Sequence, residues 1–160
     1  MDIARIIPQN TVPKYQTDNH AMSKAYQIKR RVRFGDCDPG GVIYTPNISF
    51  YIVESVRAFM DELLETPMEK AILDMGILPP AKAFSVEFIS FLKWDDQIDI
   101  LVRIKNIGTS SFTFSIVGYR DDEPTFSSEF TQVCVNPETK RPTPIPDVLR
   151  AKLTKYKNGE

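Results

Sequence analysis

The stretch "RFGDCDPGGVIYTPN", residues 33–47 of this 160-residue chain, decides the fold. It places Asp36 and Asp38 in a turn, where the following proline and two glycines supply the special dihedrals. Thr45-Pro46 then has the pattern of a helix start, because Thr is a good N-cap and Pro is favoured at the first helical position. We therefore predict a helix from about Pro46 to about Leu64.

The segment before this turn predicts a strand. Apolar and polar residues alternate from Tyr26 to Phe34, and only Arg30 interrupts the apolar set. Period-two alternation is typical of a half-buried strand, here ending at Gly35. In the helix, apolar residues recur every three to four positions and also occupy other faces, which indicates burial by more than one neighbour.

Several shorter elements follow the helix. Alternation and turn signals predict a short helix near 69–75, strands over 84–92, 98–105, 112–116 and 126–135, and an amphipathic tail helix around 148–153. The short connections favour antiparallel hairpins, and the apolar helix is the natural cover for the sheet's apolar face. We predict an α+β fold with a curved antiparallel sheet wrapped around one long central helix. Its edge strands and aromatic-rich faces suggest pairing with a second copy.

Length and composition favour one domain. Residues 1–22, with Pro8 and Pro13, read as an N-terminal arm, and residues 23–160 as the single folded unit. Apolar residues make up 42% of the chain, charged residues 26%, and the net charge of −1 argues against nucleic acid as a partner. The sequence has no run of about 18 apolar residues, so we expect no membrane span. Its first ten residues, "MDIARIIPQN", make a poor signal peptide. We expect a cytoplasmic protein with Cys37 and Cys134 as free thiols.

Few familiar catalytic patterns are present. The one histidine, His20, lies in the predicted arm, which argues against a His-containing triad in the core. The sequence has no zinc spacing, Walker loop or dinucleotide fingerprint. A calcium loop starting at Asp36 would need glutamate where Asn47 stands, so we expect no metal and no separate cofactor.

A carboxylate just before a helix N-terminus remains as the candidate chemistry. Unpaired N–H groups there can stabilise an oxyanion, while a nearby carboxylate attacks a carbonyl carbon or activates water. That arrangement suits acyl transfer. The alternative is that Asp36 and Asp38 only hydrogen-bond their own turn, as aspartates often do. From the residues alone, both interpretations stay open.

"FGDCDPGGVIYTPN" resembles the signature of the 4-hydroxybenzoyl-CoA thioesterase family, which has the hot-dog fold. The match is close through Phe34–Val42 and again at Pro46-Asn47. The resemblance implies that Asp38 is the catalytic carboxylate, as nucleophile or general base, and that a backbone N–H at the helix start, that of Thr45, donates to the thioester carbonyl. It implies a structural role for Asp36. Strand geometry turns Cys37 away from Asp38, so we expect it to pack in the interior.

The same resemblance indicates the substrate-binding residues, namely Tyr44, Thr45, Asn47, Ser110 and Ser111. Family members often carry tyrosine or histidine at the position of Thr45. In "KNIGTSSF" (residues 105–112), serines stand where some relatives carry arginines that hold CoA phosphates. Here hydroxyls and backbone N–H groups would hold the CoA, or other cations would do so, such as Lys93, Arg103 and Lys105.

The implied substrate is an acyl-CoA or acyl-carrier thioester, with CoA as part of the substrate, and the implied assembly is a homodimer or homotetramer. The resemblance implies an acyl group that is aromatic or short to medium in length. Aromatic side chains could line an aryl pocket or belong to the core: Tyr44, Tyr51, Phe88 and Phe112.

Two other hypotheses stay open beside thioester hydrolysis. One is a hot-dog protein that binds or processes acyl groups without hydrolysis, such as an acyl-carrier-dependent partner or a dehydratase. The missing core histidine counts against a dehydratase. The other is a non-enzymatic assembly module on the same scaffold.

Overall fold

The computed structural model describes residues 24–160, so the predicted arm over 1–22, with His20, lies outside the described residues. The elements follow one another as a strand, a single 3₁₀ turn, two helices, four strands and a final helix. They are β1 (Tyr26–Arg31), η2 (Phe34–Asp36), α1 (Asn47–Leu64), α2 (Met68–Asp74), β2 (Ala81–Phe88), β3 (Gln97–Ile107), β4 (Ser111–Arg120), β5 (Glu123–Val133) and α3 (Asp147–Lys157).

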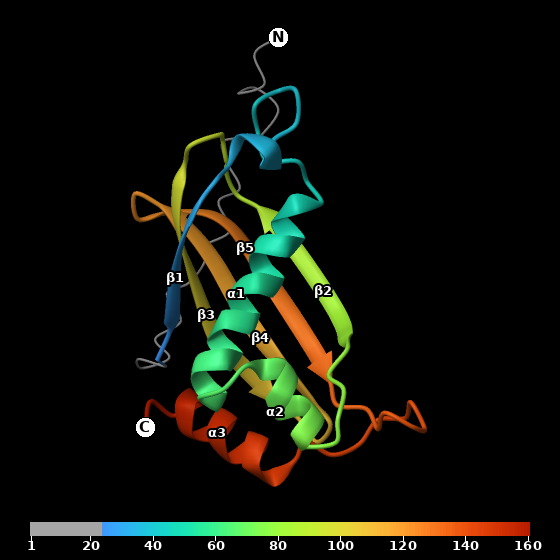
Figure 1. The fold of residues 1–160 in the computed structure, drawn as a ribbon. Helices are drawn as coiled ribbons and strands as arrows, with labels where there is room; N and C mark the ends of the chain where they lie inside the picture. The colour runs from blue at the N-terminus through green and yellow to red at the C-terminus, as the bar shows by residue number, and fades with distance from the viewer. Residues whose placement is uncertain (1–23) are drawn as a thin grey trace.

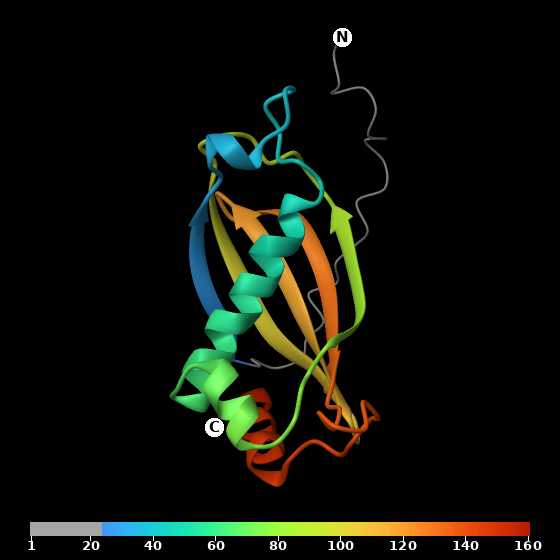
Figure 2. The ribbon, with the colours of Figure 1, turned by 45° about the vertical axis from the view of Figure 1, so that its right-hand side comes forward.

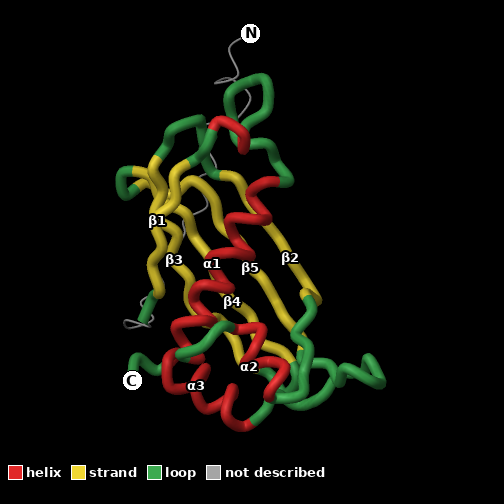
Figure 3. Tube along the Cα trace, in the orientation of Figure 1, coloured by secondary structure: helices red, strands yellow, loops and turns green. Residues whose placement is uncertain are grey.

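The five strands form one antiparallel sheet in the order β1-β3-β4-β5-β2. Figure 1 shows α1 lying across one face of this sheet, and Figure 2 shows the strands curving around the helix. The tube in Figure 3 shows α2 and α3 gathered at one end and the loop that precedes α1 at the other. The predicted α+β hot-dog architecture is confirmed.

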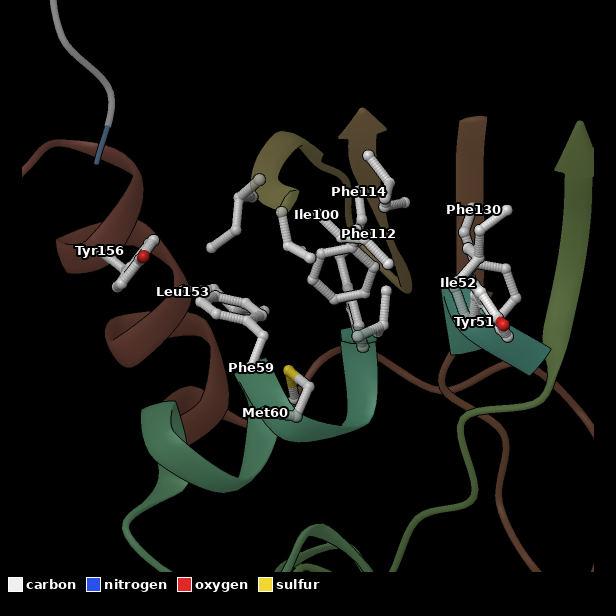
Figure 4. Packing of buried hydrophobic residues seen from close by; sticks show 14 of the residues in the cluster. Tyr51, Ile52, Phe59, Met60, Ile100, Phe112, Phe114, Phe130, Leu153 and Tyr156 are labelled. Atoms are coloured by element: carbon white, nitrogen blue, oxygen red, sulfur yellow. The ribbon is translucent and has the colours of Figure 1, made fainter. Parts of the chain in front are cut away.

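The core lies between α1 and the inner face of the sheet. Inward positions alternate along the strands, as the period of two requires: Ile98, Ile100, Val102 and Ile104 on β3 are buried. Figure 4 shows Phe59 of α1 beside Leu153 of α3, with the side chains of Phe112 and Phe114 of β4 next to them. The Phe59 ring lies 4.8 Å from that of Tyr156 and 5.8 Å from that of Phe114, so α1 joins the sheet and α3 into one core.

Strand boundaries differ from the predicted ones at several places. β2 ends at Phe88, four residues early, and β5 begins at Glu123. The turn between β4 and β5 contains only Asp121 and Asp122, both with positive φ, which is the geometry of a type I′ hairpin. Two residues thus suffice for the turn, and the strand continues through Pro124.

The strand before the site ends earlier than predicted. β1 stops at Arg31, and Phe34 stands in a single 3₁₀ turn with 77% of its surface exposed. Asp36 N–H bonds to Arg33 O at 3.0 Å, closing that turn. The alternation of apolar and polar residues therefore continues to Phe34, three residues beyond the end of β1 at Arg31.

The predicted cap of α1 is also wrong. Pro46, not Thr45, is the N-cap, and no side chain caps the helix, which begins at Asn47. The first N–H groups of α1 already bond three residues back, to the carbonyls of Tyr44, Thr45 and Pro46. A Thr45 hydroxyl therefore finds no free helical donor to accept from.

Among the helices of residues 24–160, none is both long and apolar enough to cross a membrane. Cys37 and Cys134 are both free.

Candidate functional site

The turn that carries Asp38 is a small, well-bonded hairpin. Asp38 N–H donates to Val42 O at 2.8 Å, and Gly41 N–H donates back to Asp38 O at 2.9 Å. Ile43 N–H bonds to Leu92 O at 2.8 Å, which attaches the hairpin to the segment that leads into β3. Backbone bonds thus hold the turn in place immediately before α1.

The Asp38 carboxylate is half-buried, and one of its oxygens is fixed. Gly40 N–H donates to Asp38 Oδ1 at 2.8 Å. The turn needs glycines here: a Cβ on Gly40 would lie 3.0 Å from that oxygen, and Gly41 has φ +78°. Within residues 24–160, no group donates a hydrogen bond to Oδ2. The carboxylate is therefore oriented through one oxygen and keeps the other available.

Asp36 is held by two hydrogen bonds to a single carboxylate oxygen, one of them from α1. Its Oδ2 accepts from Arg33 N–H at 3.1 Å and from the Tyr51 hydroxyl at 2.5 Å. Burial alone would raise the pKa of this carboxyl. The hydrogen bonds from Tyr51 and from Arg33 N–H, together with the charges of Arg30 and Arg33, outweigh that effect and lower the pKa below its usual value. Asp36 thus remains an ionised acceptor that joins the turn to α1.

The start of α1 is tied to the same residue. Asp36 O accepts from Tyr44 N–H at 2.8 Å and from Asn47 Nδ2 at 3.0 Å. The amide nitrogen of Asn47, a predicted substrate-binding residue, is thus engaged with the turn. Thr45 N–H finds no acceptor in the described part of the chain, and both Tyr44 and Thr45 are exposed. An unpaired donor therefore stands between bonded ones, at the predicted oxyanion position.

Ser110 and Ser111 lie at the other end of the molecule. Their loop is held by α3, since Arg150 Nη2 donates to Gly108 O and Thr109 O at 2.8 Å each. The same helix reaches the C-terminal end of α1, where Lys152 Nζ donates to Leu63 O. The eleven residues of β3 separate this loop from the Asp38 end by roughly 33 Å. Within one chain the serines and Asp38 are not brought together.

Lys93 and Lys105, two of the cations that could bind CoA phosphates, differ in their ion pairing and in their distance along the fold from Asp38. Lys105 pairs with Glu129 across the sheet, at the end of β3 near Ser110. Lys93 is exposed and lies beside the Asp38 turn, because it bridges to Val42. Lys93 is thus the candidate cation closest along the fold to Asp38.

Cys37 packs against the core, as predicted. Burial raises the pKa of its thiol, and the negative charges of Asp36, Asp38 and Asp96 raise it further. Because the thiolate is the nucleophilic form, these surroundings disfavour Cys37 as a nucleophile.

The aromatic candidates divide into core and surface. Tyr51 and Phe112 are each 1% exposed and belong to the core, whereas Tyr44 is 53% exposed. Sequence reasoning missed an exposed pair beside the turn, Phe34 and Trp94, whose rings meet edge-on at 5.9 Å. The two residues are sixty positions apart, so no local sequence pattern predicts their contact.

The sequence pattern marked Arg30 as an exception but gave no role for it. Arg30, the residue that breaks the alternation of β1, has its guanidinium 4.0 Å from the centre of the Tyr51 ring and pairs with Glu54. Glu54 is therefore paired with Arg30. No three His, Cys, Asp or Glu side chains of residues 24–160 group as ligands for a metal ion.

Comparison with known proteins finds a family that covers most of the chain. The family described as the Thioesterase-like superfamily matches residues 32–153, which begin just after β1 and include the Asp38 turn, α1, α2 and strands β2 to β5.

Two curated relatives are each 26% identical to the chain over the aligned residues. The 4-hydroxybenzoyl-CoA thioesterase of Pseudomonas sp. strain CBS-3 is 26% identical over 92 residues, covering 57% of this chain and 65% of that protein. The matched part thus spans slightly less than two thirds of that relative's length. A 1,4-dihydroxy-2-naphthoyl-CoA hydrolase of Prochlorococcus marinus subsp. pastoris is 26% identical over 127 residues, covering 76% and 84%.

A solved structure agrees with the fold. A thioesterase superfamily protein from Jannaschia sp. CCS1 superposes with a TM-score of 0.76 at 27% identity, covering 83% of this chain and 93% of that one.

Proposed function

The chain belongs to the thioesterase-like superfamily, and from that premise we propose that it hydrolyses an acyl-CoA thioester with Asp38 as its catalytic carboxylate. One observation carries the proposal. Asp38 is oriented by Gly40 N–H through Oδ1 and has Oδ2 free of donors within residues 24–160, in the turn that leads directly to the unpaired Thr45 N–H. A positioned carboxylate and an oxyanion donor are the two parts that thioester cleavage needs.

The reaction follows from these two groups. Asp38 attacks the thioester carbonyl carbon, or removes a proton from a water that attacks it. The carbonyl oxygen gains negative charge and accepts a hydrogen bond from Thr45 N–H, at the positive end of α1. The tetrahedral intermediate then collapses, the C–S bond breaks and the CoA thiolate leaves to take up a proton. If Asp38 attacked directly, water hydrolyses the resulting anhydride and restores the carboxylate.

An aromatic acyl group is the first substrate class to test. The two curated relatives are named for 4-hydroxybenzoyl-CoA and 1,4-dihydroxy-2-naphthoyl-CoA, both aryl thioesters. Tyr44, next to Thr45 and 53% exposed, offers an aromatic face beside the reacting carbonyl. Short and medium acyl chains, and acyl-carrier thioesters, are the comparison substrates.

A panel of these thioesters tests the activity. Benzoyl-type, short-chain and medium-chain acyl-CoA, each also as the acyl-carrier thioester, are incubated with the protein and free thiol is followed by its reaction with a thiol reagent. We expect turnover of the aryl-CoA thioesters. If no thioester in the panel releases thiol above the rate without protein, a non-hydrolytic acyl-binding protein or an assembly module replaces the proposal.

The complete site includes a second copy of the chain. Ser110 and Ser111 lie about 33 Å along β3 from the Asp38 end, so one substrate meets both only if two copies contribute. β2 is an edge strand with Phe84 and Phe88 each 42% exposed, and α1 leaves Phe50 63% exposed. Such an open strand with apolar neighbours suits pairing between copies in a dimer, or in a dimer of dimers.

Mixing two inactive variants tests this shared site. Asp38→Asn and the double variant Ser110→Ala/Ser111→Ala are mixed, dissociated and reassociated, and light scattering gives the mass of the assembly. A shared site predicts that the mixture regains activity through hybrid dimers. A monomeric mass, or a mixture as weak as its components, contradicts it.

A further inference from the structure

Three residues from three elements meet beneath the Asp38 turn. Arg30 on β1 lies over the Tyr51 ring of α1, and its guanidinium pairs with Glu54 one helical turn further along. The Tyr51 hydroxyl donates to the Asp36 carboxylate, although Tyr51 itself is only 1% exposed. A buried tyrosine usually needs a partner for its hydroxyl, and here that partner belongs to the turn.

We infer that Arg30, Tyr51 and Asp36 form a positioning network that sets the place of Asp38 relative to the start of α1. The inference rests on the proposed function, since it concerns how the same site is held in shape. Asp36 stands two residues before Asp38, and its carbonyl accepts from Tyr44 N–H and from Asn47 Nδ2. A shift of Asp36 therefore moves the carboxylate and the Tyr44–Thr45 segment at the same time. Arg30 and Tyr51 act through Asp36, so they are positioning residues.

The protonation states of Tyr51 and Asp36 maintain the hydrogen bond between them at neutral pH. Burial and the hydrogen bond to the Asp36 carboxylate together raise the pKa of Tyr51 to about 12, against the lowering effect of Arg30. The hydroxyl therefore stays protonated and remains a donor. The pKa of Asp36 is lowered, because the hydrogen bonds from Tyr51 and Arg33 N–H and the nearby arginine charges outweigh the opposing effect of burial. Donor and ionised acceptor are thus present together throughout the range of a thioesterase assay.

The Tyr51→Phe variant removes the hydroxyl and keeps the ring beneath Arg30. We expect kcat to fall about tenfold while KM stays within about twofold, because the lost bond orients the carboxylate and does not hold substrate. Tyr156→Phe is the matched control, since Tyr156 is a buried tyrosine near the C-terminal end of α1. It should keep the parent kcat. Thermal unfolding of both variants shows that the assay temperature lies below their midpoints.

A double variant distinguishes an effect of Tyr51 that acts through Asp36 from an independent loss of kcat. If Tyr51 acts through Asp36, then Tyr51→Phe/Asp36→Ala loses no more kcat than Asp36→Ala alone, because alanine leaves the Tyr51 hydroxyl no acceptor at position 36. Multiplied losses, or a Tyr51→Phe variant with the parent kcat, overturn the inference.

A readout without substrate keeps the inference testable even if the proposed function fails. Cys37 lies between Asp36 and Asp38 and is half-buried. Loosening of the turn in Tyr51→Phe should speed alkylation of Cys37 relative to Tyr156→Phe, because local opening exposes the thiol. Equal alkylation rates overturn the network. Failure of the proposed function looks different: the parent protein then cleaves no thioester, whatever the alkylation rates are.

Discussion

Replacing Gly40 by alanine tests whether the orientation of Asp38 matters. The new Cβ would lie 3.0 Å from Asp38 Oδ1, whereas ordinary contacts begin near 3.4 Å. The carboxylate must rotate away or the turn must shift, and either movement weakens the 2.8 Å hydrogen bond from Gly40 N–H. A hydrogen bond to a charged group contributes about 1.5–3 kcal/mol, so kcat/KM should fall by about tenfold to 150-fold.

The assay for this variant is the initial rate of thiol release from an aryl-CoA thioester. Gly35→Ala is the matched control, because it lies in the same segment and a Cβ there would meet nothing within 4 Å. Gly35 and Gly40 are both exposed, so thermal unfolding should change little in either variant. A folded Gly40→Ala protein with the parent kcat/KM would refute the reasoning that the Gly40–Asp38 contact orients the catalytic group.

Two further predictions concern the core and the charge of the turn. A Cβ on Gly118 would lie 2.1 Å from the Phe126 ring, so Gly118→Ala should lower the free energy of unfolding by about 1–3 kcal/mol or more; an unchanged urea midpoint would contradict this. Cys37 should be alkylated with a pH midpoint above that of an ordinary thiol, and Asp38→Asn should lower the midpoint by removing one of the charges that raise it. Both proteins carry Cys134→Ala so that Cys37 is the only cysteine, and identical midpoints would show that the Asp38 charge does not reach it.

Most of the fold could be predicted because the apolar residues of its strands and of α1 recur at regular spacings. The alternation of β3 and β4 and the apolar stripe of α1 both recur over several turns or pleats, so single exceptions did not obscure them. Boundaries were less predictable, since they depend on backbone bonds. Phe34 continues the alternation although the chain has already turned away from the sheet, and Thr45 has the chemistry of a cap although no donor is left for it.

The site was predictable only where its parts are neighbours in sequence. The Asp38 turn and the start of α1 lie within ten residues of each other, and the signature contains both. Arg30 appeared only as an interruption, because its partners Tyr51 and Glu54 follow more than twenty residues later. Ser110 shares the expected pattern but lies at the opposite end of the sheet. In the proposed shared site Ser110 meets Asp38 only across two copies, so no spacing within one chain indicates their relation.

In the proposed reaction the Asp38 carboxylate performs the cleavage. The kcat of the Asp38→Asn variant with saturating aryl-CoA, measured beside binding of the same thioester by calorimetry, tests this role. The amide keeps the size of the side chain but is a poor nucleophile and base, so we predict a kcat at least about 100-fold below the parent value, with binding retained and the thermal midpoint unchanged. A folded Asp38→Asn protein that cleaves the thioester at the parent rate would contradict the claim.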